Sequence, residues 1–383
     1  MNLNFIKKKD NLYNANLIGK NILELYEDKE KTDLFYRAFD YDPGKNRISE
    51  IAPDIKKYIL ISIQCCIYDP DRFYFASYAI TGDVVTFSVY EYVFATSETK
   101  LIFSFNEDKS ILTIAKKIKI FVLDPSNFLI QTESLAPERL PELMGVISFV
   151  IRLFNSESDS FLDIEIPDLI NNGINTILPL SENRLMIKCG YSFLEDQRID
   201  GLSEKEALIE SVYVTSASKF ISDLNINTTA GNLDLIDTAY FDKCISGPGV
   251  KDDIIFYNKV DTAKKTEDIN FINANTLEKY IYHMDLCDND NDHIPVVIKG
   301  TPYILIREKN RERFLNLKTG LEDMEFINEE FICSDGDILI FNKNRHKKEK
   351  MRIYSYPGVK LVFEDRLTFC NMTCKNDEYY IYI

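Results

Sequence analysis

Asn270-Phe271-Ile272-Asn273-Ala274-Asn275 repeats, with small changes, the stretch Asn11-Leu12-Tyr13-Asn14-Ala15-Asn16 near the start of the chain. Each copy is followed by a run of aromatic and aliphatic residues, Lys279-Tyr280-Ile281-Tyr282 in one case and Asn21-Ile22-Leu23-Glu24-Leu25-Tyr26 in the other. Two β-forming runs separated by a polar turn are typical of a β-hairpin. The two stretches therefore predict one hairpin near the start of the chain and one in its second half.

Looser copies begin at Arg313 and Arg352, so the starts at 270, 313 and 352 are about 40 residues apart, a period typical of repeated β-units. The chain contains 22 Tyr and 25 Phe, which favour strands. Other β-forming runs follow in close succession, at 72–80, 84–94, 100–105, 118–123 and 128–132. The pattern predicts an all-β propeller of about seven four-stranded blades, with six and eight as alternatives.

The two ends of the chain suggest how such a ring closes. Arg366–Ile383 contains opening strands of a unit but not the hairpin that should follow, and Asn11–Tyr26 contains a hairpin. Pairing the N-terminal and C-terminal strands in one shared blade would cover strand edges that otherwise favour aggregation. The sequence thus predicts a single closed domain over 1–383, and two separate β-rich domains are the alternative.

Few segments have helical periodicity. Short helical insertions are expected at 137–144, which a proline opens, and at 203–210, where Ser203 and Glu206 have the spacing of a capping box. A further short helix is considered over Ile48–Tyr58. All three would be additions to a β-framework.

The charge of the chain limits its partners. The chain has 45 Lys and Arg and 61 Asp and Glu, so its net charge is -16. This negative charge disfavours binding to nucleic acid or to an anionic membrane. The eight cysteines are mostly flanked by apolar residues, as buried reduced thiols are. No apolar stretch follows the N-terminal lysines, and the apolar run Met144–Phe154 is too short to span a bilayer. We expect a cytoplasmic protein.

Metal-ligand spacing is poor throughout. The alternating carboxylates Asp288, Asp290 and Asp292 resemble the start of a calcium loop, but His293 and Lys299 occupy the positions of its glycine and its bidentate glutamate. An exposed acidic turn is the better interpretation, with a weak calcium site as the alternative. The three histidines have no spacing that would assemble a metal face; they are His283, His293 and His346.

Other candidate groups are equally unspecific. Cys370 and Cys374 would share one face of a strand as packed thiols, and the adjacent Cys65 and Cys66 would point to opposite faces. An acid/base pair of the glycosidase kind could be drawn from Asp163, Glu165 and Asp168, although such neighbours are inevitable among 61 acidic residues. The absence of Trp disfavours sugar and quinone sites. No catalytic residue and no cofactor are assigned.

Three functions remain open. The first is a non-enzymatic interaction module that presents propeller rim loops to a protein partner, such as an acidic immunity-type or inhibitor protein that binds a basic partner. The second is a propeller hydrolase or lyase that uses carboxylates and tyrosines lining the central channel. It requires several ionisable residues to converge at one mouth of that channel with perturbed protonation. The third is a structural component of a larger assembly. The sequence favours the first.

Overall fold

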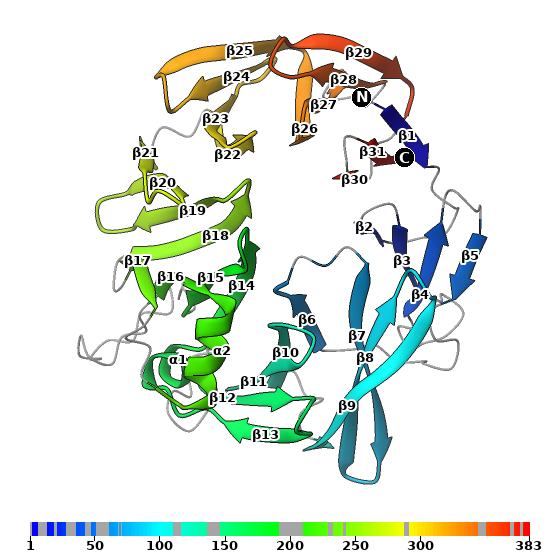
Figure 1. Cartoon of the computed structure of the whole chain (residues 1–383). Coiled ribbons are helices and arrows are strands. Elements are labelled where there is room, and N and C mark those ends of the chain that lie inside the picture. Colours follow the sequence, from blue (N-terminus) through cyan, green and yellow to red (C-terminus); the bar gives the residue numbers. More distant parts are fainter. Residues whose placement is uncertain are drawn as a thin grey trace.

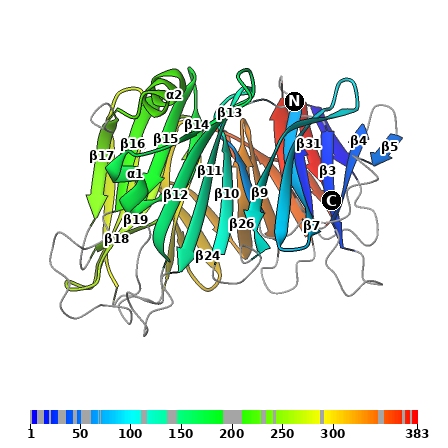
Figure 2. The same cartoon turned by 90° about the horizontal axis from the view of Figure 1, so that it is seen from below.

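The protein is a β-propeller. A computed structural model describes residues 2–6, 14–18, 21–27, 36–42, 47–50, 61–67, 69, 71–109, 116–135, 146–190, 210–228, 233–239, 243–286, 291–343, 350–367, 371–375 and 378–383. The strands in these ranges form eight sheets. Figure 1 shows the sheets in a ring around a central axis, and Figure 2 shows the ring from the side. The predicted all-β propeller is confirmed, and the described residues form eight sheets where about seven blades were expected.

Five of the sheets are regular blades, each made of four consecutive antiparallel strands. In Figure 1 the first strand of each lies nearest the axis. Their strands are β2 (Asn14–Ile18), β3 (Asn21–Glu27), β4 (Tyr36–Asp42) and β5 (Arg47–Glu50); β14 (Ile174–Leu180), β15 (Arg184–Cys189), β16 (Glu210–Ser216) and β17 (Asp234–Ala239); β18 (Lys243–Lys251), β19 (Ile254–Asp261), β20 (Thr266–Asn273) and β21 (Lys279–Asp285); β22 (Asp292–Ile298), β23 (Thr301–Arg307), β24 (Arg311–Asn316) and β25 (Leu321–Ile327); β26 (Glu329–Asp335), β27 (Ile338–Lys343), β28 (Lys350–Ser355) and β29 (Lys360–Asp365).

Two neighbouring sheets depart from this plan. One has three strands, β7 (Arg72–Thr81), β8 (Val84–Val93) and β9 (Glu98–Asp108). The other has five strands in the order β13-β12-β11-β10-β6, with bounds β6 (Ile61–Cys65), β10 (Lys116–Val122), β11 (Asn127–Leu135), β12 (Val146–Asn155) and β13 (Ser160–Asp163). Strand β6 precedes β7 in the sequence but pairs in parallel with β10 of the next sheet.

The eighth sheet contains both ends of the chain, in the order β1 (Asn2–Ile6), β31 (Glu378–Tyr382) and β30 (Asn371–Lys375). Strand β1 pairs in parallel with β31, from Asn2 opposite Glu378 to Ile6 opposite Tyr382. The predicted shared sheet is therefore present, but the strand predicted to complete it was wrong. The hairpin within Asn11–Tyr26 belongs to β2 and β3, which form their own blade.

The core lies between the faces of adjacent sheets. Along β8 buried and partly exposed residues alternate, as expected for a strand with one face in the core. Its Val85, Phe87 and Val89 pack in one cluster with Ile118 and Ile120 of β10. Clusters of this kind also join other neighbouring sheets whose side chains the structure describes, so these blades stabilise one another.

Buried polar side chains also join consecutive blades. Glu312 of β24 is 1% exposed; its Oε1 accepts from Arg307 Nε at 2.6 Å, and its Oε2 accepts from the backbone N–H of Phe331 in β26 at 2.6 Å. Glu210 of β16 likewise accepts from Lys188 Nζ at 2.6 Å and from the N–H of Ile245 in β18 at 2.7 Å. In both cases a carboxylate accepts a hydrogen bond from a backbone N–H in the first strand of the next blade.

The helices differ from the predicted ones. The described helices are α1 (Pro167–Asn172) and α2 (Ala217–Asn225). Ser216 caps the N-terminus of α2, because its hydroxyl oxygen accepts a hydrogen bond from the backbone N–H of Lys219. The expected helix at 137–144 lies outside the described residues, as does 203–210 apart from Glu210, which begins β16. The helix considered over Ile48–Tyr58 is wrong at its start, because residues 48–50 belong to β5.

No helix among the described residues is long and apolar enough to cross a membrane. A strand-based framework is consistent with this, because α1 and α2 span only 6 and 9 residues.

We expect Glu312→Ala to lower the free energy of unfolding by about 3–5 kcal/mol, because it leaves the charge of Arg307 and the N–H of Phe331 without their buried acceptor. Chemical denaturation followed by far-UV circular dichroism measures the change. The control is Glu325→Ala, which removes the exposed partner of Arg311 and should cost less than about 1 kcal/mol. Equal effects of the two substitutions would contradict the proposed role of Glu312.

Candidate active site

The first strands of three consecutive blades end close together near the axis. β18, β22 and β26 lie on the inner side of the ring in Figure 1, and each turns into its second strand through a tight turn. Positive φ angles mark all three turns, at Asp252 and Asp253, at Lys299 and Gly300, and at Gly336. Because the three strands run in the same direction, their final residues meet at one end of the ring.

Lys251 and Ser334 connect two of these strands directly. Lys251, the last residue of β18, donates from Nζ to Ser334 Oγ at 2.9 Å and also to the Ser334 carbonyl. Ser334 lies near the end of β26, is 8% exposed, and donates from Oγ to the Val297 carbonyl of β22 at 3.3 Å. The contact thus joins two blades that are not neighbours, across the first strand of the blade between them.

The surroundings destabilise the charged form of Lys251 relative to a lysine exposed to water. Burial lowers the pKa of its ammonium, and the nearby Asp335 and Asp252 only partly oppose this shift. Burial also raises the pKa of the adjacent Cys333 thiol to about 12, so that this thiol stays protonated. A neutral amine beside a hydroxyl is the arrangement in which lysine can serve as a base.

Further ionisable groups lie at the same end of the strands. Lys299 forms an ion pair with Asp337, and Asp252 Oδ2 accepts from the N–H of Gly300 at 3.0 Å. Tyr379 of β31 accepts from the N–H of Asp337 at 2.8 Å through its hydroxyl. Carboxylates, lysines and a tyrosine therefore lie at this end of the strands, and among these groups the pKa of Lys251 is lowered.

The carboxylates suggested as an acid/base pair lie elsewhere. Asp163 ends β13, the outermost strand of its sheet, and Glu165 and Asp168 follow on the way into and within α1. All three residues are exposed. They are not brought together with the inner strands that carry Lys251 and Ser334.

The structure places the other candidates as follows. Asp288 and Asp290 lie outside the described residues, and Asp292 is an exposed residue at the start of β22. His346 and Cys370 also lie outside them, and Cys374 is part of β30. Within the described part of the chain, no group of three or more His, Cys, Asp and Glu could hold a metal ion.

Two of the remaining predictions can be compared directly. Cys65 is exposed and Cys66 is buried, in agreement with side chains on opposite faces. His283 Nδ1 lies 2.6 Å from Asp268 Oδ1, and both side chains are exposed; the His293 ring lies 5.4 Å from that of Tyr282. Neither histidine contributes to the cluster around Lys251.

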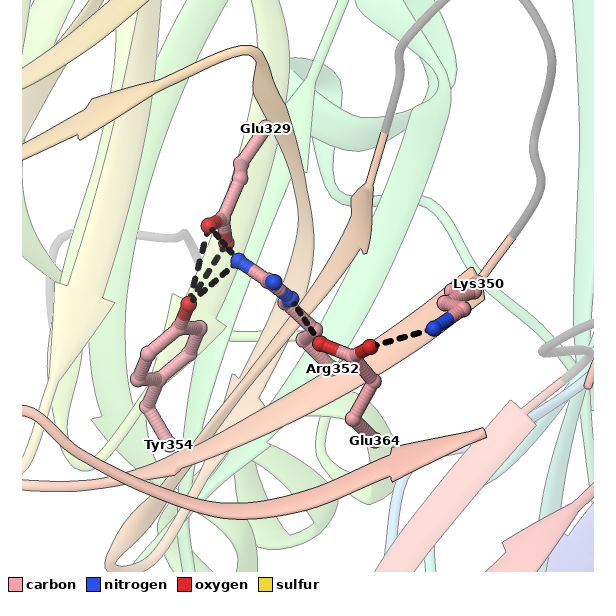
Figure 3. Close-up of polar contacts among 5 residues, drawn as sticks. All are labelled: Glu329, Lys350, Arg352, Tyr354 and Glu364. Atoms are coloured by element: carbon pink, nitrogen blue, oxygen red, sulfur yellow. Dashed lines mark hydrogen bonds and ion pairs between the residues drawn. The ribbon is translucent and has the colours of Figure 1, made fainter. Parts of the chain in front are cut away.

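The other end of β26 carries a second polar network, shown in Figure 3. Arg352 lies between two carboxylates, donating from Nη1 to Glu329 and from Nε to Glu364, each at 2.6 Å. Tyr354 donates to Glu329 at 2.9 Å, and Lys350 donates to Glu364 at 2.7 Å. Each charge drawn in Figure 3 has an opposite partner, so this network ties β26, β28 and β29 together and offers no reactive group.

The comparisons with known proteins concern the fold. No family model and no curated protein matches the sequence. Similar solved structures include a prolyl endopeptidase, with 7% sequence identity and a TM-score of 0.47. The match covers 90% of this chain and 47% of the endopeptidase. A second is the β-propeller domain of the Trilobed protease from Pyrococcus furiosus, with 11% identity and a TM-score of 0.45; the match covers 94% of this chain and 98% of that domain. A third is an oligogalacturonate lyase in complex with manganese, with 10% identity and a TM-score of 0.44; the match covers 91% of this chain and 90% of the lyase.

These comparisons correct one prediction. The sequence favoured a non-enzymatic interaction module, and this prediction is corrected here, because the similar propellers include those of several peptidases and a lyase. The chain spans about half the length of the prolyl endopeptidase that it matches. At such identities an activity has to be argued from the residues of this chain.

Glu364 generates a pH-dependent prediction. Hydrogen bonds from Lys350 and Arg352 lower the pKa of its carboxyl to about 2. The folded state therefore holds this carboxylate ionised to a lower pH than the unfolded chain does, and its stabilising effect is lost as pH falls from about 4.5 towards 2. The stability difference between the wild type and Glu364→Gln should shrink over this range.

Urea denaturation at successive pH values measures that difference. Glu165→Gln removes an exposed carboxylate from the outside of the ring and corrects for the change in net charge. A difference for Glu364→Gln that stays constant between pH 6 and about 2.5 would contradict the lowered pKa.

Proposed function

We propose that the protein is a hydrolase that cleaves an ester or amide bond, with Ser334 as the nucleophile and Lys251 as its base. The observation that carries the proposal is the 2.9 Å contact between Lys251 Nζ and Ser334 Oγ, in surroundings that lower the pKa of the lysine. Serine paired with lysine is an established variant of the serine nucleophile with a neighbouring base.

The proposed reaction has two stages. Neutral Lys251 takes the proton of the Ser334 hydroxyl while Oγ attacks the substrate carbonyl carbon, which gives a tetrahedral oxyanion. The oxyanion collapses, the bond to the leaving alcohol or amine breaks, and the Lys251 ammonium returns the proton to that group. Lys251 then takes a proton from water, which attacks the acyl carbon; the bond to Ser334 Oγ breaks, the acid is released, and the Lys251 ammonium returns the proton to Ser334.

The inner position of the pair supports this role. Ser334 is nearly buried, and charges act more strongly where water is largely excluded. The backbone of Ser334 is fixed in β26, and a rotation of its hydroxyl from the Val297 carbonyl to the neutral Lys251 amine aligns the proton for transfer. A positioned nucleophile loses little entropy on the way to the transition state.

A fluorophosphonate probe, which labels activated serines, tests the proposal. We expect labelling of the wild type at Ser334, identified by mass spectrometry of the labelled peptide, and no labelling of Ser334→Ala. Lys251→Arg keeps a donor to Ser334 but cannot act as a base, so its labelling rate should fall by about 10²–10⁴-fold. The control Ser160→Ala removes an exposed serine and should leave labelling unchanged.

The pH dependence follows from the same assignment. Because the base works in its deprotonated form, the labelling rate should rise with pH and reach half its maximum below the ordinary lysine pKa of about 10.4. A lyase reaction would need Lys251 alone and would survive in Ser334→Ala. Absence of labelling of the wild type, or labelling of Ser334→Ala at the wild-type rate, would refute the proposed hydrolase.

A further inference from the structure

The register of β26 and β27 determines where the backbone groups of Ser334 point. Only two residues separate Asp335 from its partner Ile338, so these two form the hydrogen-bonded pair that closes the hairpin. Hydrogen-bonded and non-hydrogen-bonded pairs alternate along an antiparallel ladder. Ser334, opposite Leu339, therefore belongs to a non-hydrogen-bonded pair, and its N–H and C=O point away from β27.

A side-chain contact agrees with this direction. The Ser334 carbonyl accepts a hydrogen bond from Lys251 Nζ, although Lys251 belongs to a different blade. In an antiparallel strand the N–H and the C=O of one residue leave the backbone on the same side. The N–H of Ser334 is thus directed to the edge of β26 that the Lys251 amine reaches.

This edge is open as a consequence of the fold. β26 is the first strand of a blade that has all four of its strands, and Figure 1 shows it on the inner side of the ring. The inner edge of such a strand faces the axis instead of another strand. Within the described part of the chain, no atom accepts a hydrogen bond from the Ser334 N–H.

We propose that the main-chain N–H of Ser334 holds the oxyanion in the hydrolase reaction, an inference that rests on the proposed function. When Ser334 Oγ attacks a carbonyl carbon, the carbonyl oxygen gains negative charge beside the N–H of the same residue. The Lys251 ammonium, formed as the lysine takes the proton, lies at the same edge and places a positive charge near that oxygen. The donor is fixed in a strand, so it needs no reorganisation during the reaction.

Two phosphorus probes and one altered backbone test the hydrogen bond. A fluorophosphonate places its P=O oxygen where the oxyanion would form, whereas the matching thiophosphonate places sulfur there, and sulfur is a weak acceptor. A full-length chain with 2,3-dihydroxypropanoic acid in place of Ser334 keeps the hydroxyl and replaces only the N–H by an ester oxygen. We expect the P=O probe to label it about 10²–10³-fold more slowly than the wild type, with much less change for the P=S probe.

The control carries a backbone ester at Ile340, whose N–H pairs with the Cys333 carbonyl in the β26–β27 ladder. The ester at Ser334 also weakens that carbonyl as an acceptor, so both chains disturb the same ladder bond. Thermal unfolding measures this disturbance. The ester at Ile340 should lower stability and leave the ratio of P=O to P=S labelling rates at its wild-type value.

The wild type offers a second measurement that needs no altered chain. Hydrogen exchange at the Ser334 amide, followed by NMR of ¹⁵N-serine-labelled protein, should be slower in the P=O adduct than in the P=S adduct. An unchanged ratio of labelling rates in the Ser334 ester, or equal exchange in the two adducts, would overturn the role of the N–H and leave the hydrolase intact. A wild type that neither probe labels would refute the hydrolase and this inference with it.

Discussion

The ring depends on polar bonds that the side chains of one blade make to the backbone of the next. Glu210 and Glu312 accept N–H groups from the first strands of the following blades, and Gln131 does the same for Ile174 with its amide oxygen at 2.7 Å. Hydrophobic contact between sheets has no direction, whereas these bonds fix where each first strand begins. The burial of Glu210 and Glu312 with Lys188 and Arg307 makes these bonds strong constraints on register.

That constraint explains why the inner strands end at one level. β18 and β26 begin at positions set in part by the preceding blades. They and β22 between them contain similar numbers of residues, so their final residues come together. Lys251 and Ser334 are 83 residues apart in the sequence and meet only through this arrangement. A shift of β26 by one residue would turn Ser334 to the other face of the strand and separate it from Lys251.

The sequence predicted the local features better than the non-local ones. The hairpins starting at 270, 313 and 352 all join third to fourth strands, so their spacing reported the true repeat. The hairpin at Asn14 joins a first to a second strand, and nothing local distinguishes the two kinds. The closing strand Asn2–Ile6 is short and has no turn that marks it. Neither Lys251 nor Ser334 lies in a recognisable motif, because their chemistry arises from contact between distant strands.

The ends of the chain also support the candidate site. Tyr379 belongs to the sheet that contains both termini, and its hydroxyl accepts from the N–H of Asp337 in the turn that follows Ser334. A Cβ at Gly336 would lie 2.6 Å from that hydroxyl, so glycine, at a φ of +48°, allows the close approach. Pairing of β1 with β31 holds Tyr379 in place, and the turn after β26 rests on it. Closure of the ring and the position of Ser334 are therefore coupled through one tyrosine.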